Sequence, residues 1–420
     1  MAATLTTYAN ALKTSYLPKI REQLQMKVPL WDMIDKTGEG VAGDNITMQL
    51  RKGYNEGIGA VSEGGALPTA GNSTYAEAIV PTKELYGRLQ ITYKLMKASR
   101  NNAGAFERSL TSEMKGLSTN FAHNVNRMLN GDGSGVLARV DMTTPSTALE
   151  VDASYGRAND ISGTQLFRTG MTVAIHSAKT GGSQRTGTPK ITAVTKNAGT
   201  PLYRITLASL PTSTADSDWI FRENSRGNEF VGLLGAIDAD SATETYAQTY
   251  MSINRNTAGN EFFEANVVEN AGTDRALTEE LMQEAVDLAD INGDGEISHI
   301  CCDHFQMRKY ESLVKGDRRF VTTTALKIAG GRKEKVVPTF DEKPILVDKH
   351  AVPGIMQFLD MSSLKLYLMN PSGPDWLDED GSVLKNVTGY AAYEAILGLL
   401  GDMGCERPNS NSSLRDLDVS

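Results

Sequence analysis

The stretch AFERSLTSEMKGLSTNFAHNVNRMLN, residues 105–130, decides the fold class of this chain. The run Asn130-Gly131-Asp132-Gly133 at its end is typical of a helix terminus. Apolar residues recur in the stretch at steps of three and four, the spacing that places side chains on one stripe of an α-helix: Phe106, Leu110, Met114, Leu117, Phe121, Val125 and Met128. The spacing therefore predicts one amphipathic helix about 39 Å long, whose apolar stripe packs in a core.

The segment before this helix, residues 43–97, has the pattern of two strands joined by a long loop. Both strands carry apolar residues at alternate positions, namely Ile46, Met48, Leu50, Leu85, Leu89 and Ile91. The region between them, residues 58–82, is rich in glycine and small side chains. A loop of this length in a compact domain is normally functional or disordered, and two strands alone bury little surface. We therefore expect a partner to order it.

Residues 140–229 have a different sequence pattern, in which four short runs with strand-type alternation are separated by clusters of Gly, Ser, Thr and Asn. The runs are GMTVAIHS, PKITAVT, PLYRITLASL and DWIFREN. Their length and spacing predict a small antiparallel barrel or sandwich. The segment is expected to be an insertion into the main chain.

The C-terminal half begins with a helix that Thr278 caps, and Glu279 and Glu280 lie in its first turn, where the helix dipole favours negative charge. A strand, EISHICC, and a second helix, HFQMRKYESLVKG, follow. Four strands come next: VVPTF, KPILVDKH, GIMQFLD and LKLYLMN. The apolar run from Tyr390 to Leu400 fits either a strand or a helix.

Three features of the chain together resemble the major capsid proteins of tailed bacteriophages. They are the sequence NRMLNGDGSGVLARV at residues 126–140, the extended charged segment before the long helix, and the order of elements after residue 276. The resemblance implies an α+β chain with the tailed-phage major capsid fold, which herpesviruses share. It divides the chain into an N-terminal arm (1–42, with a helix near Pro18), an extended loop (43–97), the spine helix of a peripheral domain (98–139), an inserted β-rich domain (140–229), a return to the peripheral domain (230–275), an axial domain (276–370) and a C-terminal segment that returns to the peripheral and axial core (371–420).

The same resemblance implies a structural protein that assembles with itself into hexamers and pentamers of an icosahedral shell enclosing double-stranded DNA. Portal and scaffolding or decoration proteins would be further partners, and the location would be the virion capsid, assembled in the cytoplasm of the bacterial host. In this family the extended loop lies across a neighbouring subunit, which implies intersubunit charge pairs from Arg51, Lys52, Glu56, Glu63, Lys83, Glu84 and Arg88. The alternative is an exposed hairpin with solvated charges.

The composition of the chain limits which classes of function are possible. The net charge of −9 argues against wrapping nucleic acid, which needs clustered Lys and Arg, so any enclosed DNA would be held without sequence-specific binding. No stretch approaches the roughly 20 apolar residues of a membrane helix, and the N-terminus lacks a signal-peptide pattern. We therefore expect no membrane association.

The motif DINGDGEISHIC, residues 290–301, is the one candidate metal site. Asp290, Asn292 and Asp294 match the first half of a calcium-binding EF-hand loop, but the twelfth position, where a bidentate Glu belongs, is Cys301. Asn-Gly and Asp-Gly are also common turn dipeptides. The sequence therefore favours a turn over a cation site.

No catalytic or cofactor motif is present. The chain has no GxSxG and no GxxxxGK[ST], and its GxGxxG match at residues 38–43 is followed by strand-type alternation where a dinucleotide site needs a helix. Its five histidines are scattered, and its three cysteines lack the spacing of a zinc site. We expect no enzyme, no cofactor and no catalytic residues.

Two alternatives to a phage capsid remain. An encapsulin-like compartment would share the fold but enclose enzyme cargo, and particles containing a protein passenger would distinguish it. A β-rich, calcium-stabilised surface or adhesion protein built around residues 150–230 belongs to another class, and the missing signal-peptide pattern counts against it.

Overall fold

The computed structural model describes residues 28–38, 43, 45–94, 103–152, 154–156, 166–196, 203–314, 323–327, 334–378 and 383–419. For residues 103–112, 196, 203, 323–327 and 334–337 it describes the backbone alone. The helix expected near Pro18 lies outside these ranges. Within them the first element is the short helix α2 (Pro29–Met33), which buries Leu30 and Trp31.

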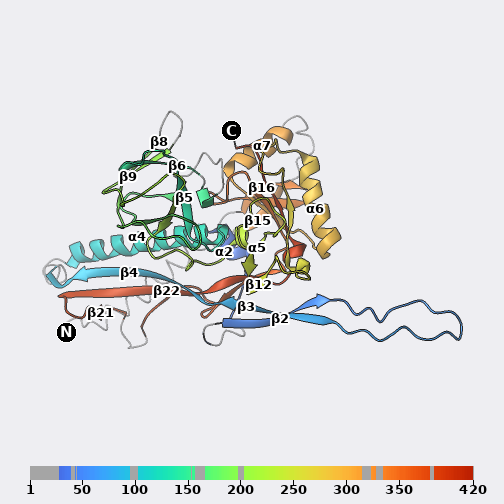
Figure 1. Cartoon of the computed structure of the whole chain (residues 1–420). Coiled ribbons are helices and arrows are strands. Elements are labelled where there is room, and N and C mark those ends of the chain that lie inside the picture. The colour runs from blue at the N-terminus through green and yellow to red at the C-terminus, as the bar shows by residue number, and fades with distance from the viewer. Residues whose placement is uncertain are drawn as a thin grey trace.

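A sheet of six strands forms the base of the molecule (Figure 1). Its strands are β1 (Asp35–Thr37), β4 (Lys83–Thr92), β19 (Leu364–Leu368), β20 (Asp375–Trp376), β21 (Lys385–Asn386) and β22 (Ala392–Cys405). Strand β22 pairs with β4 from Ala392 to Gly401 and with β19 from Gly401 to Cys405. The run from Tyr390 to Leu400, for which the sequence allowed a strand or a helix, is therefore mostly strand.

Helix α4 (Ala103–Asn130) lies along β4. It begins two residues before the predicted start and ends at the predicted residue. A Cβ atom on Gly87 of β4 would lie 3.1 Å from Leu117 Cδ1 and 3.2 Å from Phe121 Cδ2, so the helix packs closely on the strand at this glycine. Met114, Phe121 and Val125 are buried and Leu117 is half-buried. The side chains of Phe106 and Leu110 lie outside the described residues.

The hairpin of β2 (Asn45–Gly53) and β3 (Thr74–Pro81) projects from one end of this base (Figure 1). The two strands pair from Asn45 with Pro81 to Gly53 with Thr74. The prediction of a loop over residues 58–82 was therefore wrong from Thr74 onward. Small residues such as Ala76 and Ala78 resemble loop composition, but they fit where the strand packs against the core.

A β-rich lobe stands above α4 (Figure 1). Its strand order is β7-β10-β5-β6-β9-β8, and all of its pairings are antiparallel. Val173 N donates to Pro189 O at 3.1 Å, and Thr172 bridges to Lys190, so the two edges of the sheet are joined. The elements are β5 (Val136–Val140), β6 (Ala148–Asp152), the short 3-10 turn η1 (Ser154–Gly156), β7 (Val173–His176), β8 (Ile191–Lys196), β9 (Tyr203–Leu207) and β10 (Trp219–Arg222).

A second lobe contains a seven-stranded mixed sheet with strand order β13-β23-β18-β14-β17-β16-β15. Helix α6 (Glu279–Gly293) begins as predicted, because Thr278 Oγ1 accepts a hydrogen bond from Leu281 N. The other elements are β13 (Asn266–Val268), β14 (His299–Cys302), α7 (His304–Val314), β15 (Thr323–Lys327), β16 (Glu334–Phe340), β17 (Lys343–Val347), β18 (Met356–Leu359), the turn η5 (Pro408–Ser410) and β23 (Ser412–Leu414).

Residues 230–265 connect these parts mainly through loops. Their regular elements are α5 (Leu233–Ala236), β11 (Thr249–Tyr250), β12 (Ile253–Asn254) and η3 (Glu261–Phe263). Arg255 is buried here and donates to the carbonyl oxygens of Gly235, Ala236 and Phe263. A buried guanidinium thus satisfies backbone groups that no strand ladder reaches.

Of the helices that the structure describes, none combines the length and apolar character needed to cross a membrane.

Candidate functional site

Of the elements that the structure describes, the hairpin of β2 and β3 reaches farthest from the body (Figure 1). Residues 54–73 join its strands without regular secondary structure. Within this loop, Asn55 Oδ1 accepts a hydrogen bond from Gly57 N at 2.8 Å. A Cβ atom on Gly57 would lie 2.9 Å from Gly71 N, so glycine lets the two arms of the loop run close together. The loop is therefore a narrow ribbon and not a folded lobe.

The ribbon exposes large apolar side chains. Ile58 is 89% exposed and Leu67 is 84% exposed. Tyr54 and Val61 of the ribbon are also exposed, as is Tyr75 at the start of β3. Exposed apolar residues that gather on one projecting segment indicate an interaction surface, whereas scattered ones do not.

The base of the hairpin, in contrast, belongs to the core. Ile46, Ala78 and Val80 are buried, and Ile79 N donates to Met251 O at 2.8 Å. Lys52 Nζ donates to Asn260 Oδ1 at 3.0 Å. The hairpin is thus fixed where it leaves the body, and its far end has no contact of this kind among the described residues.

The seven charged residues predicted for intersubunit contacts differ in what they contact. Arg88 forms an ion pair with Glu394 across β4 and β22 at 2.5 Å, and Lys83 Nζ donates to Gly227 O at 2.7 Å. Lys52 makes the contact with Asn260 described above. The remaining four, which have no ion pair with another described residue, are Arg51, Glu56, Glu63 and Glu84.

A buried polar junction lies at the C-terminal end of α4, and sequence reasoning did not find it. Arg127 Nη1 donates to Glu229 Oε2 at 2.7 Å, and both side chains are at least 94% buried. Asn126 Nδ2 donates to Asp348 Oδ1 at 2.7 Å. The available signal was the polar pair Asn126-Arg127 beside the apolar stripe residues Val125 and Met128 near the end of the helix. The junction joins α4 to two segments that are distant in sequence.

Burial controls the ionisation of this junction. Desolvation lowers the pKa of His350 to about 3, and the neighbouring Lys349 adds to this effect. Desolvation also raises the pKa of Asp348, although hydrogen bonds from His350 N and Asn126 oppose the shift. His350 is therefore neutral near pH 7.

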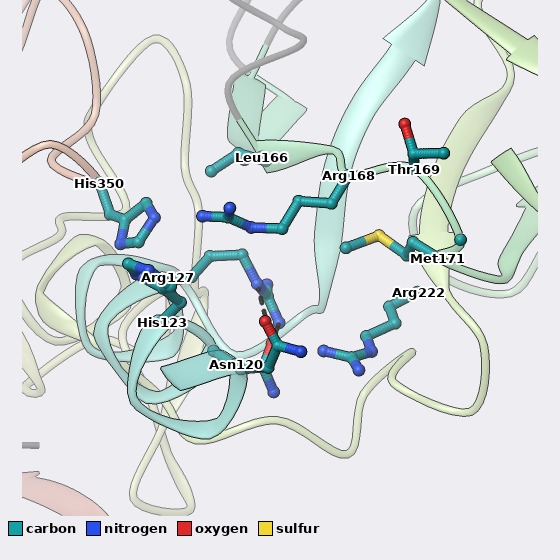
Figure 2. Close-up of a pocket in the computed structure, with 11 residues that line it drawn as sticks. Asn120, His123, Arg127, Leu166, Arg168, Thr169, Met171, Arg222 and His350 are labelled. Atoms are coloured by element: carbon teal, nitrogen blue, oxygen red, sulfur yellow. Dashed lines mark hydrogen bonds between the residues drawn. The ribbon is translucent and has the colours of Figure 1, made fainter. Parts of the chain in front are cut away.

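A cavity of about 280 Å³ opens beside the junction (Figure 2). Helix α4 contributes Asn120, His123 and Arg127, the segment before β7 contributes Arg168, and β10 contributes Arg222. Among the residues that the structure describes, no carboxylate lines this cavity. The cavity is therefore positively charged.

The candidate calcium loop does not have the shape of an EF-hand. Asp290 and Asn292 belong to the last turn of α6, and Asp294 is its left-handed C-cap. Asn292 Nδ2 donates to Asn266 Oδ1 at 2.7 Å, so its side chain packs against β13. Among the described residues no group of three His, Cys, Asp or Glu side chains is arranged to hold a metal ion.

The three cysteines are free and buried. Desolvation raises the pKa of the Cys405 thiol to about 12, and it also raises those of Cys301 and Cys302. A thiol with a raised pKa is a poor nucleophile near pH 7.

No protein-family model and no curated protein matches the chain. Among solved structures, a chain of the cyanophage A-1(L) capsid asymmetric unit is similar with a TM-score of 0.54 and 11% sequence identity, over 93% of this chain and 93% of that chain. The capsid of the native GTA particle matches with a TM-score of 0.46 at 9% identity, over 93% of this chain and 90% of that chain. The encapsulin complex from Synechococcus elongatus matches with a TM-score of 0.27 at 13% identity, over 37% of this chain and 54% of that chain.

The cyanophage match spans nearly the whole of both chains. At this level of identity it shows a shared fold. The chain therefore has the α+β fold of a phage capsid protein.

Proposed function

We propose that this chain is the major capsid subunit of a tailed bacteriophage, which assembles with copies of itself into an icosahedral shell that encloses double-stranded DNA. One observation carries the proposal: a chain with a phage capsid fold presents a long hairpin whose far end exposes apolar side chains.

Holding the hairpin in one conformation costs conformational entropy. Fixing a backbone costs roughly 1–2 kcal/mol per residue, and an isolated two-stranded hairpin is at best marginally stable in water. Residues 54–73 bury little surface within their own chain. A neighbouring copy that covers Ile58 and Leu67 would supply the missing burial.

Charge supports the same partner. Arg51, Glu56 and Glu63 carry both signs near the end of the hairpin and form no ion pair with another described residue. A surface of mixed sign suits contact with a repeated copy of itself better than contact with the uniform negative charge of DNA. We infer that these residues, with Glu84, are the stronger candidates for intersubunit pairs, because Arg88 already has a partner in Glu394.

The parts of the chain would then have the following roles. Helix α4 is the spine of a peripheral domain, the seven-stranded sheet with α6 and α7 belongs to an axial domain, and the β-rich lobe of residues 140–229 is an insertion. Axial domains would meet in hexamers and pentamers, and hairpins would lie across neighbours. Portal and scaffolding or decoration proteins would be further partners in the host cytoplasm.

Removing the far end of the hairpin tests the proposal. Replacing residues 55–72 by a short Gly-Ser turn keeps the pairing of Gly53 with Thr74. We expect the variant to fold normally by circular dichroism, because its core lies elsewhere, and to form no closed shells by light scattering and electron microscopy. Intact particles of normal size and stability would contradict the proposal.

A milder pair of variants provides the control. Ile58→Ser combined with Leu67→Ser removes the two most exposed apolar side chains of the ribbon, whereas Tyr390→Ser removes one that is 72% exposed next to β22, outside the hairpin and the proposed axial domain. Only the double variant should weaken assembly.

Nuclease-protected DNA in wild-type particles is expected, and a protein passenger in its place would favour an encapsulin-like compartment.

A further inference from the structure

The cavity beside the polar junction collects arginines from three separate segments. Figure 2 shows the side chains of Arg127, Arg168 and Arg222 around one cavity, to which α4, the segment before β7 and β10 contribute them; Arg168 extends toward His350 and Arg222 toward Asn120. These segments lie up to 95 residues apart in the sequence. Their meeting is therefore a property of the fold and not of a local basic run.

The charges of this cavity do not balance. Arg127 is paired with Glu229, and each of the two carboxylate oxygens accepts a hydrogen bond from its guanidinium group. Within the part of the chain that the structure describes, Arg168 and Arg222 form no ion pair. The described part of the wall thus carries more positive than negative charge, although the Glu229 carboxylate also stabilises the protonated form of Arg222.

The effect of this charge reaches the neighbouring groups. Burial lowers the pKa of Arg222, and the charge of Arg127 lowers it further. Arg127 and Arg168 also contribute to the lowered pKa of His350. Like charges held this close repel each other, and an anion between them would relieve the repulsion.

We propose that this cavity binds a phosphate-class oxyanion between Arg168 and Arg222, with the amide of Asn120 and the imidazole of His123 as further polar contacts. The planar forks of two arginines suit the oxygens of a tetrahedral anion. A volume of about 280 Å³ holds one such anion with water. Free phosphate and a phosphodiester group of nucleic acid share this chemistry.

A bound anion would act as a bridge. Arg168 precedes β7, Arg222 ends β10 and Asn120 belongs to α4. Occupancy would therefore fasten the β-rich lobe to the long helix. This inference stands apart from the assembly role, since it concerns contacts within one chain.

Equilibrium dialysis of the full chain against labelled inorganic phosphate tests the proposal, with chloride holding the ionic strength constant. We expect one phosphate per chain. Arg168→Gln and Arg222→Gln should each weaken binding by roughly tenfold or more. Arg168→Lys, which keeps the charge but loses the fork, should fall between Arg168→Gln and the wild type.

Arg204→Gln is the matched control, because it removes one positive charge from the same sheet at a residue that pairs with Glu150 outside the cavity. It should leave phosphate binding unchanged. Arg168 is exposed, so its variants should fold even if Arg222→Gln does not. No stoichiometric binding, or equal weakening by all three glutamine variants, would overturn the proposal.

A short DNA duplex without terminal phosphates identifies the source of the anion. Displacement of labelled phosphate by the duplex in the wild-type chain, together with direct duplex binding that weakens in Arg168→Gln, would assign the cavity to a phosphodiester group. Phosphate binding that the duplex does not affect would assign it to the free ion.

Discussion

Asp238 shows how single residues hold the irregular part of this chain together. Its carboxylate accepts a hydrogen bond from Arg415 at 2.8 Å and lies 3.9 Å from Arg255, and all three side chains are buried. It also accepts hydrogen bonds from the backbone N–H groups of Tyr246 and Ala247. One carboxylate therefore offsets two buried cations and shapes the loop beside them.

Asp238→Asn is expected to be strongly destabilising, because it removes the buried carboxylate that lies against the guanidinium groups of both Arg255 and Arg415. The loss should be about 3–5 kcal/mol in the free energy of unfolding, measured by urea denaturation. Asp341→Asn is the control, since Asp341 pairs with Lys343 at the surface and such pairs contribute about 0–1 kcal/mol. Similar losses in the two variants would show that the cluster adds nothing beyond a surface pair.

At the scale of elements, the contacts of α4 change along its length. Gly116 has open space around the position of a Cβ atom, whereas at the C-terminal end Gly232 approaches the helix so closely that its Cβ would lie 2.3 Å from Met128 O. The middle of the helix therefore tolerates added atoms at Gly116, and its end requires glycine in the segment that packs on it.

Gly116→Ala should stabilise the protein by about 0.5–1 kcal/mol, because glycine inside a helix carries an entropic cost that alanine does not. Gly232→Ala should destabilise it, since a methyl group would meet backbone atoms of α4. Melting temperatures of the two variants against wild type provide the measurement. A fall in the melting temperature of Gly116→Ala would mean that this face of α4 is covered.

At the scale of the whole molecule, the described residues form a well-packed body with a thinly packed extension. Backbone that makes few buried contacts opens at low free energy and is cut first by proteases. The loop of residues 54–73 fits this description, and it contains Glu56 and Glu63.

A protease specific for Glu should therefore cut the unassembled chain first at Glu56 and Glu63. In assembled particles the same bonds should be protected, because a neighbouring copy would cover them under the proposed function. Mass spectrometry of early fragments measures both states. Equal cleavage of particles and free chains would argue that the hairpin stays exposed after assembly.

The sequence predicted the elements whose evidence is local. The spacing of Met114, Phe121 and Val125 predicted α4, and Thr278 predicted the start of α6, because helix periodicity and capping act within a few residues. The alternation around Ile46 and Leu89 likewise predicted strands in β2 and β4.

Features built from distant residues were beyond local patterns. The Arg127–Glu229 pair joins positions 102 residues apart, and the arginine cavity depends on the packing of three segments. Strand β3 was assigned to a loop because Ala76 and Ala78 lack a strong β signal, although their position against the core makes small side chains suitable.

Strand β22 pairs with β4 along one part of its length and with β19 along another, and this has a mechanical consequence. Ten of its residues pair with β4 and five with β19, with Gly401 common to both. A pull along β22 loads both ladders in shear, so that many hydrogen bonds must break together instead of one after another. Tension applied where β22 pairs with β4 would thus pass along the backbone of β22 to the part that pairs with β19. The strand therefore couples the two ends of the base sheet mechanically.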